Sequence, residues 1–159
     1  MGIERVREAN LPELLPLLRA YCDFYEATPL DDALLVLARA LIADPEREGV
    51  QLLARDGDGR AVGFATVYWS WATTDAQRIG VMNDLYVAPE ARGSGTAEGL
   101  IEACRAECRR QGAAKLTWQT ALDNDRAQRV YDRIGATKEH WLDYWLPVEP
   151  AGEPAGSSE

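Results

Sequence analysis

The chain has 159 residues, of which 47% are hydrophobic, and a formal net charge of −9 at pH 7. This length and apolar content suit one folded domain and are too small for two full ones. Nucleic-acid binding depends on Lys and Arg side chains that neutralise phosphates, so the negative net charge argues against a nucleic-acid partner. The same charge favours a cationic small molecule as ligand, with solubility as the alternative explanation.

The first half of the chain predicts one strand, two helices and a hairpin. Residues 3–7 alternate apolar and charged side chains, which is typical of a half-buried strand. Asn10 is a favourable N-cap for the first helix, in which Pro16 should cause a bend or a restart. A second apolar periodicity indicates another helix, and residues 49–55 and 61–71 then predict two strands joined by an Asp-Gly turn.

The second half predicts strands and helices in alternation. Strands are expected over residues 78–87, 115–120 and 138–146, and helices over residues 95–111 and 124–134. Antiparallel strands therefore come first and β-α-β units follow. This order predicts an α+β fold with a mixed, mostly antiparallel central sheet and helices on both of its faces.

We expect one domain over residues 1–147 and a disordered tail over residues 148–159, because the residues after 148 lack large apolar side chains. No apolar run resembles a signal peptide or a membrane span, so we expect a cytoplasmic protein without a membrane partner. The three cysteines form an odd set that argues against a disulfide framework. With His140 as the only histidine, they also argue against zinc, so no metal is expected.

A glycine-containing stretch, Arg92-Gly93-Ser94-Gly95-Thr96-Ala97, lies between a predicted strand and a predicted helix. Glycine lets backbone N–H groups approach an anion closely, and the helix N-terminus adds a favourable dipole. The stretch lacks the GK[ST] ending of a Walker A loop and the third glycine of a Rossmann fingerprint. It therefore predicts a phosphate-binding loop of another kind, with a ligand-free strand-to-helix turn as the structural alternative.

Two motifs in the chain resemble those of the GCN5-related N-acetyltransferase (GNAT) superfamily. Residues 87–97 match the pattern V-x-P-x-x-R-G-x-G-x-[GA], and residues 124–136 match N-x-x-A-x-x-x-Y-x-x-x-G-[FA]. The resemblance extends over residues 1–147, is weakest before residue 50, and is closest to diamine and small-amine acetyltransferases. It implies a sheet of six to seven strands that splays between strands 4 and 5, acetyl-CoA as the donor, and a homodimer.

The resemblance also implies which residues bind the donor. They comprise strand residues that pair with the pantetheine arm, loop residues whose N–H groups hold the pyrophosphate, and residues of the second motif. These are Leu85, Tyr86, Val87, Arg92, Gly93, Ser94, Gly95, Thr96, Ala97, Asn124, Ala127 and Tyr131. For Asn124, a plain helix cap is an equally good interpretation, and both roles are compatible.

For catalysis, the resemblance implies that Tyr131 is the general acid that protonates the CoA sulfur, with core packing as the structural alternative. Relatives carry a Glu-Asp pair where this chain has Asn83 and Asp84. An amide cannot take a proton, so Asn83 can only position a water. In a regular strand, the Asp84 side chain points to the face opposite that of Asn83. Asp84 could act through a water chain, bind the amine, or be a structural carboxylate. The general base therefore stays open.

The amine acceptor is expected near carboxylates and aromatic rings, because both attract alkylammonium groups. The candidates are Asp23, Glu26, Trp69 and Trp71, with solvated surface acids and core tryptophans as alternatives. Trp141 and Trp145 share a face of the last predicted strand and suit a dimer interface.

Together these features predict acetyl transfer from acetyl-CoA to the primary amine of a small, cationic molecule. Direct attack in a ternary complex is expected, since neither motif contains a cysteine that could carry the acetyl group. One alternative is an acyl-CoA-binding sensor or interaction protein without turnover, which the departure at Asn83 favours. Another is acetylation of protein or peptide lysines or N-termini. The acceptor's identity and the use of other acyl-CoA donors stay open.

Overall fold

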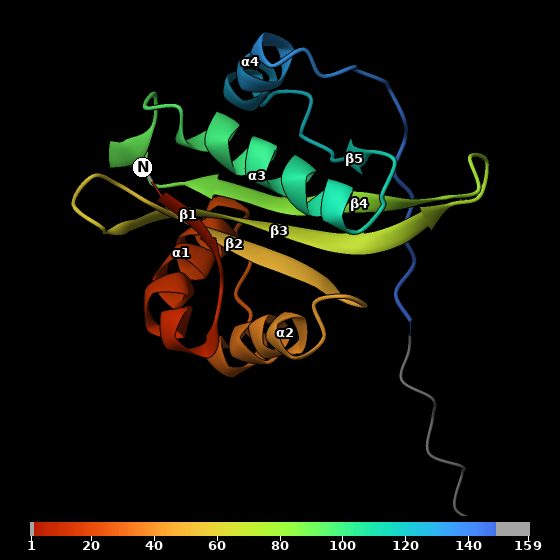
Figure 1. Cartoon of the computed structure of the whole chain (residues 1–159). Coiled ribbons are helices and arrows are strands. Elements are labelled where there is room, and N and C mark those ends of the chain that lie inside the picture. Colours follow the sequence, from red (N-terminus) through yellow and green to blue (C-terminus); the bar gives the residue numbers. More distant parts are fainter. Residues whose placement is uncertain (1, 149–159) are drawn as a thin grey trace, which may run out of the picture.

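The computed structural model describes residues 2–148, whose backbone forms a five-stranded sheet between two layers of helices (Figure 1). The strands follow their sequence order across the sheet. They are β1 (Gly2–Arg5), β2 (Gly49–Arg55), β3 (Ala61–Ala72), β4 (Gln77–Val87) and β5 (Leu116–Thr117). Neighbours from β1 to β4 are antiparallel, whereas β5 is parallel to β4. The predicted mixed, mostly antiparallel sheet of an α+β fold is therefore confirmed.

Helices lie on both sides of the sheet, as predicted (Figure 1). One side carries α1 (Leu11–Phe24) and α2 (Asp31–Ala43), and the other carries α3 (Thr96–Arg110) and α4 (Asp125–Arg133). Two short 3₁₀ turns, η1 (Glu8–Asn10) and η2 (Pro89–Ala91), precede α1 and α3. None of the helices within residues 2–148 is both long and apolar enough to cross a membrane.

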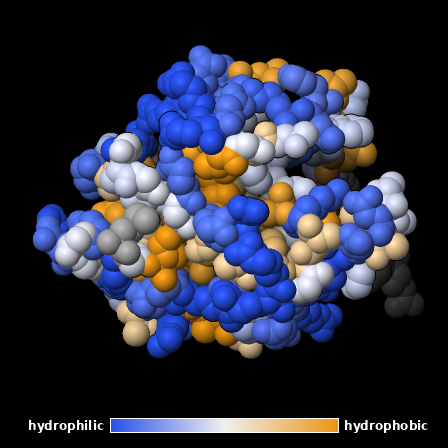
Figure 2. All heavy atoms as spheres, turned by 45° about the horizontal axis from the view of Figure 1, so that its top comes forward, coloured by the Kyte–Doolittle hydropathy of each residue, from blue (hydrophilic) through white to orange (hydrophobic). Residues whose placement is uncertain are grey.

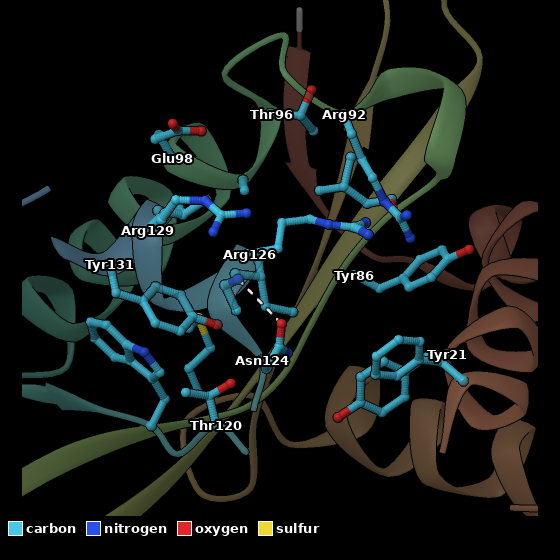
Figure 3. Close-up of a pocket in the computed structure, with 18 of the residues that line it drawn as sticks. Tyr21, Tyr86, Arg92, Thr96, Glu98, Thr120, Asn124, Arg126, Arg129 and Tyr131 are labelled. Atoms are coloured by element: carbon cyan, nitrogen blue, oxygen red, sulfur yellow. Dashed lines mark hydrogen bonds between the residues drawn. The ribbon is translucent and has the colours of Figure 1, made fainter. Parts of the chain in front are cut away.

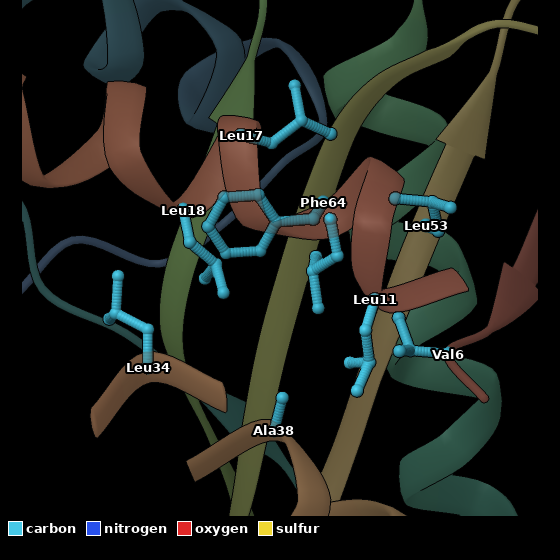
Figure 4. Close-up of a cluster of buried hydrophobic side chains, with 9 residues drawn as sticks. Val6, Leu11, Leu17, Leu18, Leu34, Ala38, Leu53 and Phe64 are labelled. Carbon is cyan, nitrogen blue, oxygen red and sulfur yellow. The ribbon is translucent and has the colours of Figure 1, made fainter. Parts of the chain in front are cut away.

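The core on the α1 side is built around Phe64 of β3, which is fully buried (Figure 4). Leu11, Leu14 and Leu18 recur at helical spacing and turn one stripe of α1 towards this ring. The expected restart at Pro16 does not occur, and α1 continues through it. Pro16 lies on the exposed side near the first turn, where its ring meets solvent.

The sheet has five strands among the described residues, which is fewer than the six to seven expected. The predicted strand over residues 138–146 is an extended segment without a strand partner, and the strand predicted over residues 115–120 is only Leu116–Thr117. The large apolar side chains of this segment, from Trp141 to Leu146, would stabilise a strand only where other residues cover them. No other segment within residues 2–148 covers residues 138–146, so they form no ladder.

The cysteines Cys22, Cys104 and Cys108 are free thiols. Cys104 and Cys108 are buried on the inner face of α3, as their spacing predicts. Burial raises the pKa of Cys104 to about 12, so this thiol stays protonated and a poor nucleophile at neutral pH.

A buried carboxylate, Glu107 of α3, links the helix to the edge of the sheet. Its side chain is 2% exposed and accepts hydrogen bonds from Arg5 Nε at 2.9 Å and Arg110 Nε at 3.1 Å. Burial by itself would raise the pKa of Glu107, but the hydrogen bonds from the two guanidinium groups outweigh it and lower this pKa.

We expect Glu107→Gln to lower the free energy of unfolding at pH 7 by about 1–3 kcal/mol, because it removes two charge-assisted hydrogen bonds in a buried place. A lowered folded-state pKa adds stability above the ordinary Glu value, and this stability is lost as the pH falls through the folded pKa. The melting temperature of the wild type should therefore fall more steeply below about pH 4 than that of the variant. Glu102→Gln on the exposed face of α3 is the matched control and should change little. Equal acid sensitivity of wild type and Glu107→Gln would contradict this account.

Candidate functional site

A cleft of about 590 Å³ opens between the end of β4, the loop into α3, the residues after β5, helix α4 and the end of α1. Figure 2 views the molecule from the side of α3 and α4 and shows hydrophobic residues gathered among hydrophilic ones. The structure brings many of the predicted site residues to this cleft. They are Asn83, Leu85, Tyr86, Val87, Arg92, Gly93, Thr96, Ala97, Asn124, Ala127 and Tyr131.

The loop before α3 presents a series of unpaired backbone donors. Gly93 and Gly95 have φ angles of 77° and 84°, in the left-handed region that favours glycine, and Gly95 is the N-cap of α3. Within the described part of the chain, none of the N–H groups of residues 93–97 donates to a backbone carbonyl. Ser94 Oγ donates to the carbonyl of Ala91 at 2.6 Å and holds the loop in place. Unpaired N–H groups at a helix N-terminus form an anion site.

Three arginines add positive charge to this cleft in an otherwise acidic protein. Arg92, Arg126 and Arg129 extend into the space between α4 and the end of β4 (Figure 3). Arg92 Nε donates to the carbonyl of Val87 at 3.0 Å. Among residues 2–148, Arg126 and Arg129 have no carboxylate within ion-pair distance and no hydrogen bond, whereas Arg133 pairs with Glu98. Arg126 and Arg129 were not predicted as site residues, although their positions in the first turns of an N-capped helix were a sequence signal for them.

The edge of β4 that faces the cleft is largely open. β5 pairs with β4 only at Gly80 and Val81, so the part of β4 from Met82 to Val87 has no described strand partner on this edge. Such an edge offers backbone N–H and C=O groups to an extended ligand.

A β-bulge at Asn83 determines which side chains of β4 face the cleft. Asp84 lies opposite Thr66 and Met82 opposite Val67, so Asn83 is the additional residue of the strand. Asn83 lines the cleft, whereas Asp84 does not. The Asn83 side-chain amide donates to Asp84 Oδ1 at 2.9 Å. The regular alternation of side chains between the two faces of β4 is therefore interrupted at Asn83 and Asp84.

Asp84 lies among tyrosines on the α1 side of the sheet. Burial raises the pKa of Tyr68 to about 12, and the charge of Asp84 adds to the effect. Burial and the same carboxylate also raise the pKa of Tyr21, whose hydroxyl donates to the carbonyl of Asn83 at 3.4 Å. Both phenols are therefore protonated at neutral pH.

Tyr131 and Asn124 come from α4 and face the cleft (Figure 3). Asn124 caps the helix, since its Oδ1 accepts the N–H of Ala127 at 3.2 Å. Tyr131 packs edge-to-face on Trp118, with ring centroids 5.2 Å apart. Burial, with a smaller contribution from Tyr25, raises the pKa of Tyr131, which keeps its phenol protonated and able to donate a proton.

The structure does not bring the four predicted acceptor residues to this cleft. Asp23 and Glu26 are exposed near the end of α1. Trp69 donates from Nε1 to the carbonyl of Pro45 at 2.8 Å, and Trp71 is 65% exposed beneath the guanidinium of Arg78.

Three aromatic residues at the end of α1 line the cleft instead: Tyr21, Phe24 and Tyr25. Tyr21 and Tyr25 stack edge-to-face with centroids 5.0 Å apart, as do Phe24 and Tyr25. Their spacing of three and four residues was the available sequence signal, because such residues share one helix face.

Among the described residues, no group of three or more His, Cys, Asp or Glu is arranged to hold a metal ion. That the protein uses no metal remains a prediction, because an empty arrangement of side chains does not test it.

One family model and several known proteins resemble most of this chain. The model of the acetyltransferase (GNAT) family matches residues 11–136. An uncharacterized N-acetyltransferase of Bacillus subtilis, YhfO, is 31% identical over 152 residues, which cover 95% of this chain and 99% of that protein. A thialysine N-epsilon-acetyltransferase of Bos taurus is 27% identical, with 98% and 99% of the two chains covered. The crystal structure of a probable acetyltransferase has a TM-score of 0.81 at 28% identity and covers 95% of this chain and 100% of its own.

Proposed function

Because this chain belongs to the acetyltransferase (GNAT) family, we propose that it moves an acetyl group from acetyl-CoA to the primary amine of a small, cationic molecule. The observation that carries the proposal is one cleft that combines unpaired loop N–H groups with a protonated tyrosine. The loop N–H groups can bind the phosphates of acetyl-CoA, and the tyrosine can protonate the thiolate that leaves.

The donor would lie along the open edge of β4. Its pantetheine amides would pair with the backbone of Leu85, Tyr86 and Val87, where β4 and β5 are proposed to splay apart. The limited pairing of β5 with β4 supports this placement. The pyrophosphate would accept hydrogen bonds from the N–H groups of residues 93–97, with the Arg92 side chain beside it, because the Arg92 N–H already donates to the carbonyl of Pro89. Asn124 and Ala127 would contact the pantetheine arm from α4.

We expect Arg126→Gln to weaken acetyl-CoA binding by about 10-fold, because one charge-assisted contact to phosphate contributes about 1.5 kcal/mol. The salt dependence of binding should also become shallower. Calorimetry at two salt concentrations measures both effects. Arg105→Gln, on the exposed face of α3, is the control and should leave both unchanged. Binding of unaltered affinity and salt dependence in Arg126→Gln would remove this residue from the donor site.

The reaction is proposed as direct attack. The amine nitrogen adds to the thioester carbonyl carbon, whose oxygen is stabilised by N–H groups of β4, and the C–S bond then breaks. The thiolate sulfur takes the phenol proton of Tyr131, the proton of the attacking amine leaves through water, and a solvent proton then restores the phenol. The high pKa of the buried Cys104 thiol agrees with a route that uses no acetyl-cysteine.

The proton acceptor is proposed to be Asp84, acting through a water that Asn83 positions. The hydrogen bond between the two side chains and the position of Asn83 at the cleft support this relay. Asp84 itself lies outside the cleft lining, so direct contact with the amine is not part of the proposal.

The acceptor is proposed to enter beside the aromatic residues at the end of α1. Tyr21, Phe24 and Tyr25 can hold an alkylammonium group by cation–π contacts, while Asp23 and Glu26 attract it from nearby. The relative named for thialysine is in keeping with a small amine. The exposure of Phe24 and Tyr25 also keeps a lysine side chain of a peptide as a second candidate acceptor.

The proposed active form is a cytoplasmic homodimer. Free cysteines fit a reducing compartment, and exposed tryptophans after α4 suit an interface.

A turnover screen tests the proposal. The full chain would be incubated with acetyl-CoA and with polyamines, lysine analogues, aminoglycosides or a lysine peptide, and thiol release would be measured. Release that depends on one amine class is the expected result. Tight CoA binding without release from any amine would instead favour a sensor, for which the amide at Asn83 is the supporting observation.

A further inference from the structure

The open edge of β4 ends at Met82, where the pairing with β5 begins. β5 pairs with β4 at Gly80 and Val81, and Met82 is the next residue of β4 and lines the cleft. From Met82 to Val87, β4 has no strand partner on this edge within residues 2–148. Met82 therefore lies at the closed end of the open edge, whereas Val87 lies at its other end, where its carbonyl accepts a hydrogen bond from Arg92.

Met82 belongs to the floor of the cleft. It is only 3% exposed, although it lines the cleft. It is part of a buried cluster that includes Val67, its partner on β3, and Cys104 of α3. The partly buried rings of Trp118 and Tyr131 pack against the same cluster. A methionine is flexible where it has space, but protein interiors are close-packed, so this thioether cannot move aside without displacing the core.

The direction of the donor follows from the proposed function. Its pyrophosphate would lie at the loop before α3, and its pantetheine arm would run along β4 from Val87 through Leu85. Each residue of a strand advances this path by about 3.3 Å, so the thioester end of the arm arrives near Asn83 and Met82. Tyr131, the proposed donor of a proton to the sulfur, turns its ring into the same cleft (Figure 3). The acyl group would therefore point at Met82.

We infer that Met82 limits the length of the acyl group that the cleft accepts. An acetyl group would end against the thioether, and each further methylene would have to occupy the space that Met82 fills. Acetyl donors are thereby favoured over butyryl and longer ones. This inference rests on the proposed function and deepens it, because the loop, Asn124 and Tyr131 would hold the CoA part of every acyl-CoA alike and do not distinguish one acyl chain from another.

Calorimetric titration of the full chain with acetyl-, propionyl-, butyryl- and hexanoyl-CoA, without an amine, tests the inference. The wild type should bind butyryl-CoA at least about 10-fold more weakly than acetyl-CoA, the usual effect of an additional methylene that a pocket cannot hold. Met82→Ala removes the thioether and leaves a space in the floor, so this variant should lose the preference. A wild type that binds both donors equally, or a Met82→Ala variant that keeps the wild-type preference, would overturn the inference.

Val67→Ala is the matched control. Val67 lies opposite Met82 in the sheet and is fully buried in the same cluster, but it does not line the cleft. The variant should lose stability through a cavity in the core and keep the preference for acetyl-CoA. A loss of preference as large as that of Met82→Ala would show that the core as a whole, and not Met82, sets the acyl length.

Met82→Val decides the case if Met82→Ala does not fold. Valine is favourable in a strand and has a shorter side chain than methionine. This variant should bind propionyl-CoA relatively better than the wild type does, and an unchanged ratio of propionyl-CoA to acetyl-CoA affinity would overturn the inference. Absence of acetyl-CoA binding to the wild type would overturn the proposed function and this inference with it, whereas acetyl-CoA binding without a preference among acyl chains would overturn the inference alone.

Discussion

A Tyr131→Phe variant is expected to bind acetyl-CoA as the wild type does and to lose about 10²- to 10⁴-fold in kcat, the usual contribution of a general acid. Phenylalanine keeps the ring on Trp118, whose centroid lies 5.2 Å away, and removes only the hydroxyl. Burial raises the pKa of Tyr131, so its phenol carries the proton throughout the neutral range. The leaving thiolate would lose this donor.

Steady-state kinetics with the best amine from the screen measures the effect, and calorimetry measures donor affinity. Tyr144→Phe removes a hydroxyl from an exposed tyrosine outside the cleft and serves as the control. If Tyr131→Phe turned over at the wild-type rate, Tyr131 would be a packing residue and the general acid would have to be sought elsewhere.

The second large effect is expected from Gly95→Val, which should weaken acetyl-CoA binding by at least about 100-fold. Gly95 caps α3 with a φ angle of 84°, which a β-branched residue adopts only with strain. The loop would relax away from this geometry, and its N–H groups would no longer converge on the pyrophosphate. Loss of two charge-assisted hydrogen bonds, at about 1.5–3 kcal/mol each, accounts for a change of this size.

Gly112→Val provides a matched control at the other end of α3. Gly112 has a φ angle of 65°, and, as at Gly95, an added Cβ would meet nothing within 4 Å. The two variants should therefore lose similar stability through backbone strain, but only Gly95→Val should lose the donor. Equal donor affinity in both variants would show that the loop before α3 does not hold the phosphates.

The grouping of residues on the proposed donor side of the cleft was predictable from sequence because their signals are local. Glycines between a strand and a helix, an N-cap at Asn124 and a tyrosine seven residues later depend on neighbours in the chain, and the structure brings them to one cleft. The central strands β2, β3 and β4 were predictable for the same reason, since apolar runs and turns bound them.

The remaining features depend on long-range pairing. The bulge at Asn83 arises from the register between β3 and β4, which no pattern within β4 reveals. Because of this bulge, the side chains of Asn83 and Asp84 cannot be assigned to opposite faces of β4 by regular alternation. Trp69 and Trp71 share a strand face, but neither lines the cleft, because Trp69 donates to the carbonyl of Pro45 and Trp71 lies beneath Arg78.

The last predicted strand shows a different limit. The apolar side chains from Trp141 to Leu146 suggest a strand, yet within residues 2–148 this segment is exposed and has no strand partner. Composition predicts that such a segment needs covering, and it does not specify which edge covers it.

The central claim is that the cleft binds acetyl-CoA. Isothermal titration of the full chain with acetyl-CoA tests it most directly, with CoA as the competing ligand. The account predicts saturable binding of one acetyl-CoA per chain, displaced by CoA and lost in Gly95→Val but not in Gly112→Val. Absence of binding to a folded wild-type chain, or binding that Gly95→Val leaves unchanged, would contradict it.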